Sequence, residues 1–300
     1  VVVSGPPHFA HAAGRRAAAR LGVPFVMDLR DPWSLAERVP DAYGSPLYLN
    51  AAARDERRAV GAAGLVVCNT ELAAEAMRAA YPAAAGRIVA VMNGTDDDEP
   101  LPDVPAPDAF VIRYAGAVYF DRSPAQLFRA VARVAAERGL TPAELRVEFM
   151  GSVEGGAGAL AALAGRAGLD PAFVRELGPR PRAEAQAFLA GAAMLVSLPQ
   201  DTRTAVPSKL FEYARCPAWV LVLAEPDSAS ALLFRDSDAD VVRDDADAIA
   251  GVVGRRYAEW AAGGRPAPVG SDGRFSRRAQ AERLFARIEA LPAAARQAPA

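Results

Sequence analysis

Short apolar runs alternate with helical patterns along almost the whole chain. Residues 65–68, 110–114 and 194–198 are three such runs, and each is followed in the chain by a segment with helical periodicity. Parallel strands need a long crossover connection, usually a helix, so this alternation predicts parallel sheets. The fold class that we predict is α/β.

The predicted elements follow from apolar periodicity and from the glycines and prolines that punctuate it. Strands are expected at 1–4, 23–28, 65–68, 87–91, 110–114, 146–150, 173–177, 194–198, 218–223 and 240–242. Helices are expected at 9–21, 47–62, 71–80, 124–138, 158–167, 182–190, from Lys209 onward, 228–234, 246–260 and 276–290.

The alternation is interrupted by residues 96–109, an acidic and proline-rich stretch without periodicity that is typical of a linker. We therefore predict a first domain over 1–95 and a second over 110–265. A helix at 274–291 is expected to pack back on the first domain, and 292–300 to form a disordered tail. Asp96, Asp97 and Asp98 are interpreted as solvated linker residues, because no further metal ligands follow at a defined spacing.

Val1 lies inside a predicted strand with no methionine before it. We expect an N-terminal piece to be missing, which would leave the first domain incomplete. An incomplete sheet has an exposed edge and lacks part of its binding site, so this chain is expected to be a poor enzyme.

Composition excludes a general nucleic-acid binder, because a net charge of −2 does not supply the basic face which that role needs. No apolar run reaches the roughly 18 residues that span a bilayer. We predict a cytoplasmic protein and leave open a peripheral contact with the inner face of the membrane. Cys68 and Cys216 are isolated in apolar surroundings, which favours buried thiols in a reducing compartment.

Lys209 is the only lysine among 34 basic residues. An ammonium acts as a point charge on a phosphate, whereas arginine presents a planar fork. Pro207 and Ser208 precede it, so the lysine stands at a predicted helix start, where backbone N–H groups attract anions. A solvated lysine on an ordinary amphipathic helix is the alternative.

Gly116 and Arg122 follow the first strand of the second domain. Glycine lets a phosphate approach the backbone, and an arginine then binds it through two hydrogen bonds. Together, Arg122 and Lys209 would neutralise a diphosphate. Glu212, three residues after Lys209, would accept two ribose hydroxyls or form an ion pair with Lys209.

In the first domain, unusual residues follow two predicted strands, where parallel sheets bind their ligands. They are Gly5, Pro6, Pro7 and His8 after one strand, and Asp28, Arg30, Asp31 and Trp33 at the end of the next. Charges directly after an apolar strand are unfavourable unless paired or functional, and a structural Asp–Arg pair is the alternative. A metal site on His8 and His11 lacks further ligands, so we predict no metal.

Five runs in this order resemble the family-4 glycosyltransferases, and more narrowly a bacterial subgroup associated with cell-surface polysaccharides. They are Ser4–His8, Asp28–Trp33, Asn93–Asp96, Tyr114–Gly116 with Arg122–Pro124, and Pro207–Tyr213. The resemblance extends from Val1 to about Leu291. It implies the GT-B architecture, in which two Rossmann-like domains face a cleft and the second binds the nucleotide-sugar donor. It also implies metal-independent transfer with retention at the anomeric carbon.

The resemblance implies a role for each matching residue. Donor-binding residues would be Gly116, Arg122, Ser208, Lys209 and Glu212; catalytic residues His8, Asp28, Arg30 and Asp31; and acceptor-side residues Gly5, Pro6, Pro7 and Trp33. Thr204 departs from the family pattern. At this position, eight residues before Glu212, members of the family commonly have a second glutamate.

The function that we predict is transfer of a sugar from a nucleotide diphosphate sugar to a carbohydrate or lipid-linked acceptor, without cofactor or metal. Two alternatives stay open at this point. One is a non-hydrolysing nucleotide-sugar epimerase, and the other is a non-catalytic GT-B-like protein that binds a sugar nucleotide or serves as a scaffold.

Overall fold

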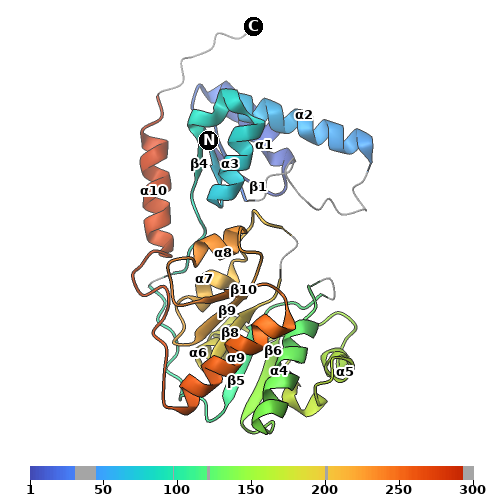
Figure 1. Cartoon of the computed structure of the whole chain (residues 1–300). Helices are drawn as coiled ribbons and strands as arrows, with labels where there is room; N and C mark the ends of the chain where they lie inside the picture. The colour runs from blue at the N-terminus through green and yellow to red at the C-terminus, as the bar shows by residue number, and fades with distance from the viewer. Residues whose placement is uncertain (31–44, 97, 120–121, 200–201, 293–300) are drawn as a thin grey trace. The chain divides into compact units, whose positions relative to one another are not determined.

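The computed structural model describes residues 1–30, 45–96, 98–119, 122–199 and 202–292. The chain divides into two compact units, which we call the first and second domains. The first comprises residues 1–96, 201–206 and 275–300. The second comprises Asp97–Gln200 and Pro207–Arg274. Figure 1 shows the elements of both domains, each of which is described by itself.

The first domain is built on a parallel sheet of order β1-β2-β3-β4. Its elements are β1 (Val2–Gly5), α1 (Phe9–Leu21), β2 (Val26–Leu29), α2 (Pro46–Ala62), β3 (Leu65–Cys68), α3 (Glu71–Ala80), the 3₁₀ helix η2 (Pro82–Arg87), β4 (Ile88–Ala90) and α10 (Arg277–Glu289). Helices α1, α2 and α3 contribute to a core on one face of the sheet, around Met27, Val66 and Met77.

The opposite face of this sheet meets α10, from the far end of the chain. Val26, Leu65 and Val67 are buried there against Leu284 and Ile288 of that helix. Alternate residues of a strand point to opposite faces, so β3 is buried on both sides and its sequence is a continuous apolar run. In β2 only Asp28 interrupts such a run.

The second domain is built on a parallel sheet of order β10-β9-β8-β5-β6-β7. Its strands are β5 (Phe110–Ala115), β6 (Leu145–Met150), β7 (Val174–Glu176), β8 (Met194–Ser197), β9 (Trp219–Leu223) and β10 (Asp240–Val242). Its helices are α4 (Ala125–Arg138), α5 (Ala159–Arg166), the 3₁₀ helix η4 (Pro171–Phe173), α6 (Arg182–Ala190), α7 (Lys209–Tyr213), α8 (Ala229–Leu233) and α9 (Ala246–Ala261).

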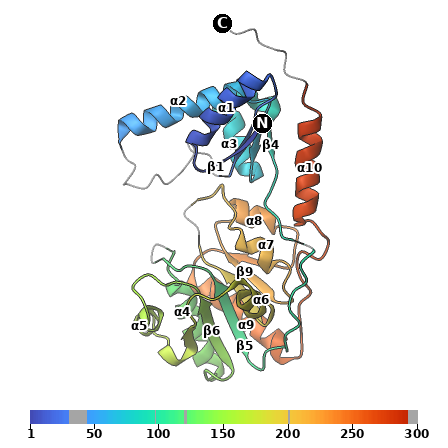
Figure 2. The ribbon, with the colours of Figure 1, turned by 180° about the vertical axis from the view of Figure 1, so that it is seen from behind.

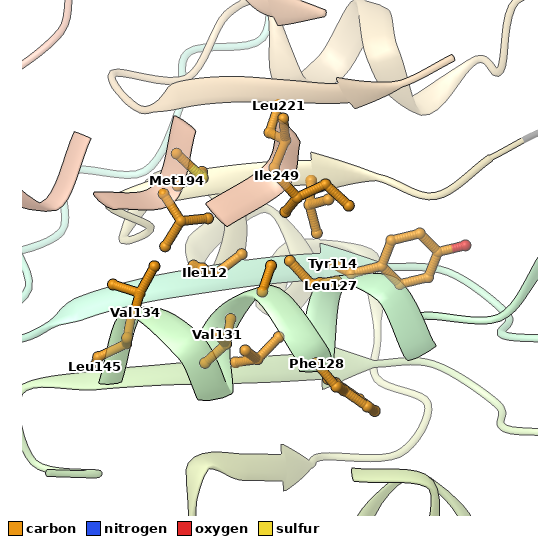
Figure 3. Close-up of a cluster of buried hydrophobic side chains, with 14 of the residues drawn as sticks. Ile112, Tyr114, Leu127, Phe128, Val131, Val134, Leu145, Met194, Leu221 and Ile249 are labelled. Carbon is orange, nitrogen blue, oxygen red and sulfur yellow. The ribbon is translucent and has the colours of Figure 1, made fainter. Parts of the chain in front are cut away.

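Helices α4 and α9 lie side by side on one face of this sheet (Figure 1). Figure 3 shows the core that they enclose, in which Ile112 of β5 and Met194 of β8 meet Val131 of α4 and Ile249 of α9. Helix α6 packs against β5 on the opposite face, as Figure 2 shows from behind. Both predictions of a parallel sheet between helices are confirmed.

Three strands, β2, β4 and β7, begin later than predicted, and prolines in the preceding residues explain the change. Strand β2 begins at Val26 rather than at residue 23, because Pro24 has no N–H to donate to a sheet. Strands β4 and β7 are shorter than predicted, since the 3₁₀ turns η2 and η4, each with proline at its start, occupy the preceding residues.

The predicted linker region makes definite contacts. Asp96 accepts a hydrogen bond from Arg277 at 2.6 Å, and Glu99 accepts one from Arg182 at 2.9 Å. Asp97 lies outside the described residues. Cys68 and Cys216 are free and buried, and burial raises the pKa of each thiol to about 12. Among the described helices, none has both the length and the apolar character that crossing a membrane demands.

An ion cluster around Glu148 of β6 lies on the face that α6 covers, and it includes Arg113 of β5 and, at 3.6 Å, the exposed Arg175 of β7. The Glu148 side chain is only 5% exposed and lies 2.9 Å from Arg113 and 2.8 Å from Arg146. Arg113 also donates to the Phe188 carbonyl oxygen of α6 at 2.7 Å. A carboxylate in such a position is stable only while its cationic partners remain.

Glu148→Gln should therefore destabilise the second domain by about 3 kcal/mol, because two partly buried guanidinium groups lose their counter-charge. The measurement is equilibrium unfolding in urea. Glu137→Gln is the matched control, since its ion pair with Arg133 is exposed and its loss should change the stability little. Equal stability of Glu148→Gln and wild type would contradict the structural role of the cluster.

Candidate functional site

The candidate donor site lies at the carboxyl ends of β5, β6 and β8, where parallel sheets present their loops. Gly116 directly follows β5, and Gly151 directly follows β6. Their φ angles are +132° and +145°, which residues with a side chain rarely adopt. A Cβ on Gly151 would stand 2.2 Å from the Gly116 carbonyl oxygen, so the two strand ends approach closely because residue 151 has no side chain.

The Lys209 side chain reaches across to this strand end. Its Nζ donates a hydrogen bond to Tyr114 Oη at 2.6 Å and lies 3.8 Å from the centre of the Tyr114 ring. A Cβ on Gly116 would stand 2.6 Å from the same nitrogen. The space left by the missing side chain of Gly116 is therefore the space that the ammonium occupies.

Two tyrosines hold this arrangement together. The Tyr114 hydroxyl donates to the Ala117 carbonyl oxygen at 2.9 Å, which leaves its oxygen lone pairs to face Lys209. Tyr213, fully buried in α7, accepts a hydrogen bond from the Ala115 backbone N–H at 3.1 Å. That bond connects α7 to the end of β5 and so places Lys209 beside Gly116.

Burial governs the electrostatics of the site. It lowers the pKa of Lys209 to about 8, and the nearby Arg122 guanidinium adds to the decrease. Burial raises the pKa of Tyr114 to about 12, so this hydroxyl stays protonated at neutral pH. Lys209 and Arg122 are thus close enough to repel one another, which favours an anion between them.

The remaining predicted donor residues lie nearby but are more exposed. Ser208 directly precedes α7, and its side chain makes no capping hydrogen bond. Glu212 is exposed, and its ion pair in the described structure is with Arg182 at 4.0 Å rather than with Lys209. Because α7 spans only Lys209–Tyr213, it has little helix dipole, and the charge of the site comes from side chains.

In the first domain, the ends of β1 and β2 bring several predicted residues together. Ser4 Oγ donates to a carboxylate oxygen of Asp28, and the buried His11 ring lies 3.3 Å from the Asp28 carbonyl oxygen. The His8 and His11 ring centres are 5.9 Å apart. Gly5 is buried against both rings, where a Cβ would stand 2.6 Å from His11 Cε1.

The other predicted residues of the first domain are less constrained. Pro6 and Pro7 are exposed in the loop after β1, and the Arg30 side chain is exposed at the end of β2. The Arg30 N–H donates to the Gly5 carbonyl oxygen at 3.2 Å. Asp31 and Trp33 lie outside the described residues. Within the described ranges, His, Cys, Asp and Glu side chains do not gather in threes suited to a metal ion.

Sequence reasoning missed the residues that support the site. The sequence assigns no supporting role to Tyr114 or Tyr213, and it does not indicate that Glu56 is buried with Tyr81 as a hydrogen-bond partner. A glycine directly after each of two adjacent strands was a usable signal for the close approach of Gly116 and Gly151. Nothing in the sequence distinguishes Glu56 from other acids on an amphipathic helix.

No protein-family model matches the sequence, and a search of curated proteins finds no match. Solved structures do match the fold. HepE of Anabaena, in complex with UDP and glucose, has a TM-score of 0.68 and 16% identity over 97% of this chain and 78% of its own. A UDP-forming trehalose-phosphate synthase from Burkholderia xenovorans has a TM-score of 0.64 and 13% identity over 97% of this chain and 73% of its own.

Sucrose-phosphate synthase from Thermosynechococcus elongatus has a TM-score of 0.65 and 15% identity over 97% of this chain and 74% of its own. At such identities the likeness concerns the fold. The two Rossmann-like domains with parallel sheets adopt the GT-B fold of these glycosyltransferases.

Because Lys209 is the only lysine, ¹³C-lysine labelling should give one Cε signal that reports this site. We expect that signal to titrate near pH 8 in the folded protein and near about 10.4 in denaturant. Between about pH 8 and about pH 10.4 the unfolded chain therefore binds one more proton than the folded chain. The free energy of unfolding of the second domain should rise with pH over this range. Tyr114→Phe should lower the native midpoint further, because the ammonium loses its acceptor. A native midpoint near the ordinary value would contradict burial of this ammonium.

Proposed function

We propose that the protein transfers a sugar from a nucleoside diphosphate sugar to a carbohydrate or lipid-linked acceptor. The observation that carries this proposal is the partly buried Lys209 ammonium beside Gly116, with Arg122 close by. Two cations at a glycine-lined strand end suit a diphosphate, whose oxygens need both charge and close backbone approach. HepE was solved with UDP-glucose, and the trehalose-phosphate synthase is described as UDP-forming, which supports a uridine donor as the first to test.

In this proposal, Lys209 and Arg122 stabilise the negative charge that develops on the departing diphosphate. Gly116 admits the phosphate, Ser208 adds a hydroxyl donor, and Glu212 accepts hydrogen bonds from the ribose hydroxyls. The reaction is that of a family-4 enzyme, with retention at the anomeric carbon.

The first domain serves the acceptor. Its polar groups at the ends of β1 and β2, His8, Asp28 and Arg30, would contact the reacting sugar and the acceptor hydroxyl, with Gly5, Pro6 and Pro7 beside them. The setting that we propose is bacterial cell-surface polysaccharide synthesis in the cytoplasm, at the inner face of the membrane.

A second candidate is a GT-B protein that binds a sugar nucleotide without turning it over. The observation that favours it is Thr204, which stands where the resembling family commonly has a glutamate. Both candidates predict binding of a nucleoside diphosphate, and only the first predicts release of that product in the presence of an acceptor.

Lys209→Met should weaken UDP binding by about 1.5–3 kcal/mol, or roughly 10- to 150-fold in Kd, because a charge-assisted contact is lost. Since the free lysine loses its proton above about pH 8, wild-type affinity should also fall as the pH rises further. In Lys209→Met the fall in UDP affinity above about pH 8 should vanish. UDP itself titrates equally in both experiments, so the difference between the two proteins reports Lys209 alone.

Calorimetry at several pH values provides the measurement. Arg166→Met removes an exposed cation elsewhere in the second domain and should leave UDP affinity unchanged. Equal UDP affinity of wild type and Lys209→Met would remove this site from the proposal. Binding of GDP, ADP and dTDP, measured in the same way, establishes whether another base is preferred.

Transfer should proceed without a divalent ion, because the proposed site meets the donor charge with Lys209 and Arg122. Turnover, measured as UDP released from UDP-glucose with a sugar acceptor, should be the same with and without EDTA. Replacing Asp96 and Asp98 together by asparagine should also leave turnover unchanged. Activity that disappears with EDTA and returns with magnesium or manganese would overturn this part of the proposal.

A further inference from the structure

The outer face of α1 carries an ordered stripe of side chains. His11, Gly14 and Ala18 are buried on the inner face of this helix, which leaves the opposite face to solvent. The exposed residues there follow the spacing i, i+4, i+7 and i+11, and they are Phe9, Ala13, Arg16 and Arg20. Such spacing aligns the side chains in one row, with the large apolar one at the start of the helix and the arginines toward its end.

Helix α2 repeats the same stripe. Its inner face is buried through Glu56, Ala59 and Val60. At the same four spacings its exposed residues are Leu47, Ala51, Arg54 and Arg58. Phe9 is 76% exposed and Leu47 is 83% exposed. A single exposed apolar side chain is common, but two at the same place in two matching stripes form a pattern that needs a physical reason.

The two stripes lie on neighbouring helices. Helices α1 and α2 pack against each other on one face of the first-domain sheet (Figures 1 and 2). Since α1 connects β1 to β2, α2 connects β2 to β3 and these strands are parallel, both helices run in the same direction. Each stripe extends over roughly 16 Å at 1.5 Å per residue. We call the surface that the two stripes form the α1–α2 face.

The α1–α2 face is positively charged. Of its four arginines, only Arg58 has an ion pair with a described residue, an exposed contact with Asp55 at 3.7 Å that water screens. Helix α1 contains no acidic residue, and the other acid of α2, Glu56, is only 5% exposed on the inner side. The chain as a whole has a net charge of −2. This face therefore has the opposite sign to the whole chain.

A partner that fits the α1–α2 face must offer many negative charges over an extended area and a layer that takes up apolar side chains. The surface of a bilayer that contains anionic lipids has both, because its phosphates attract arginines and its acyl chains accept phenylalanine and leucine. A nucleic acid also offers phosphates, but it has no apolar layer in which a leucine is buried. The combination of charge with Phe9 and Leu47 thus favours lipid.

We infer that the α1–α2 face binds the surface of a membrane that contains anionic lipids, with Phe9 and Leu47 inserted among the lipids and the four arginines at the phosphates. This binding does not rest on the proposed transfer reaction, because it needs neither nucleotide nor acceptor. One consequence does rest on that reaction: an enzyme held at a membrane is suited to a lipid-linked acceptor rather than to a free carbohydrate.

The test is co-sedimentation of the full chain with two kinds of vesicle, phosphatidylcholine alone and equal parts of phosphatidylcholine and phosphatidylglycerol. Wild type should bind the mixed vesicles at least roughly 100-fold more tightly than the neutral ones, and added salt should weaken the binding. Replacing Arg16 and Arg20 together by glutamine should weaken it roughly 30-fold, which corresponds to about 1 kcal/mol per arginine. Glutamine at Arg54 and Arg58 should have the same effect.

The apolar part is tested by Phe9→Ser and Leu47→Ser, each of which should weaken binding several-fold and leave its salt dependence unchanged. Helix α10 provides matched controls, because it lies on the opposite face of the sheet and also exposes a phenylalanine between two arginines. Glutamine at both Arg283 and Arg287, or serine at Phe285, should leave vesicle binding unchanged. All these positions are exposed, so circular dichroism of every variant should match wild type.

Failure of the wild type to bind the mixed vesicles would overturn the inference. So would equal binding to neutral vesicles, or a loss in the α10 variants as large as in those of α1 and α2. Single-stranded RNA that binds more tightly than the vesicles, and is lost in the same arginine variants, would assign the face to a nucleic acid instead. If vesicle binding is as expected while the wild type fails to bind UDP, the proposed function is wrong and the membrane surface stands.

Discussion

Parallel pairing of β5 with both β6 and β8 is the constraint on which the candidate donor site depends. Because the three strands run in the same direction, their carboxyl ends meet at one edge of the sheet. Gly116 and Gly151 can then approach one another, and the chain after β8 returns to the same edge as α7. The Tyr213 hydroxyl connects that helix to the Ala115 N–H and so determines where Lys209 stands.

The position of Lys209 is a compromise between opposing terms. Burial removes water from the ammonium and lowers its pKa, while the Tyr114 hydroxyl and ring partly replace that water. Repulsion from Arg122 adds to the penalty. An anion that binds between the two cations would relieve both effects, since it restores a strong partner to each. In the proposed function, that anion is the diphosphate of the donor.

The two domains differ in their electrostatics although both are parallel α/β units. In the second, a lysine and an arginine stand near glycines at the sheet edge. In the first, the corresponding loops carry two histidines and Asp28.

The sequence by itself determined the elements and the fold class. Leu65–Cys68, Glu71–Ala80 and Arg182–Ala190 have the same bounds in the structure as in the pattern, since apolar periodicity and turn residues act over a few neighbouring positions. The uniqueness of Lys209 could also be read directly. Tertiary structure alone decided which groups meet: Tyr114 and Lys209 are 95 residues apart in the chain, and Glu56 and Tyr81 are 25 apart. Local patterns carry no information about such contacts, because they form only when strands pair and helices pack. For the same reason the burial that lowers the pKa of Lys209, and the burial of Glu56, are properties of the fold.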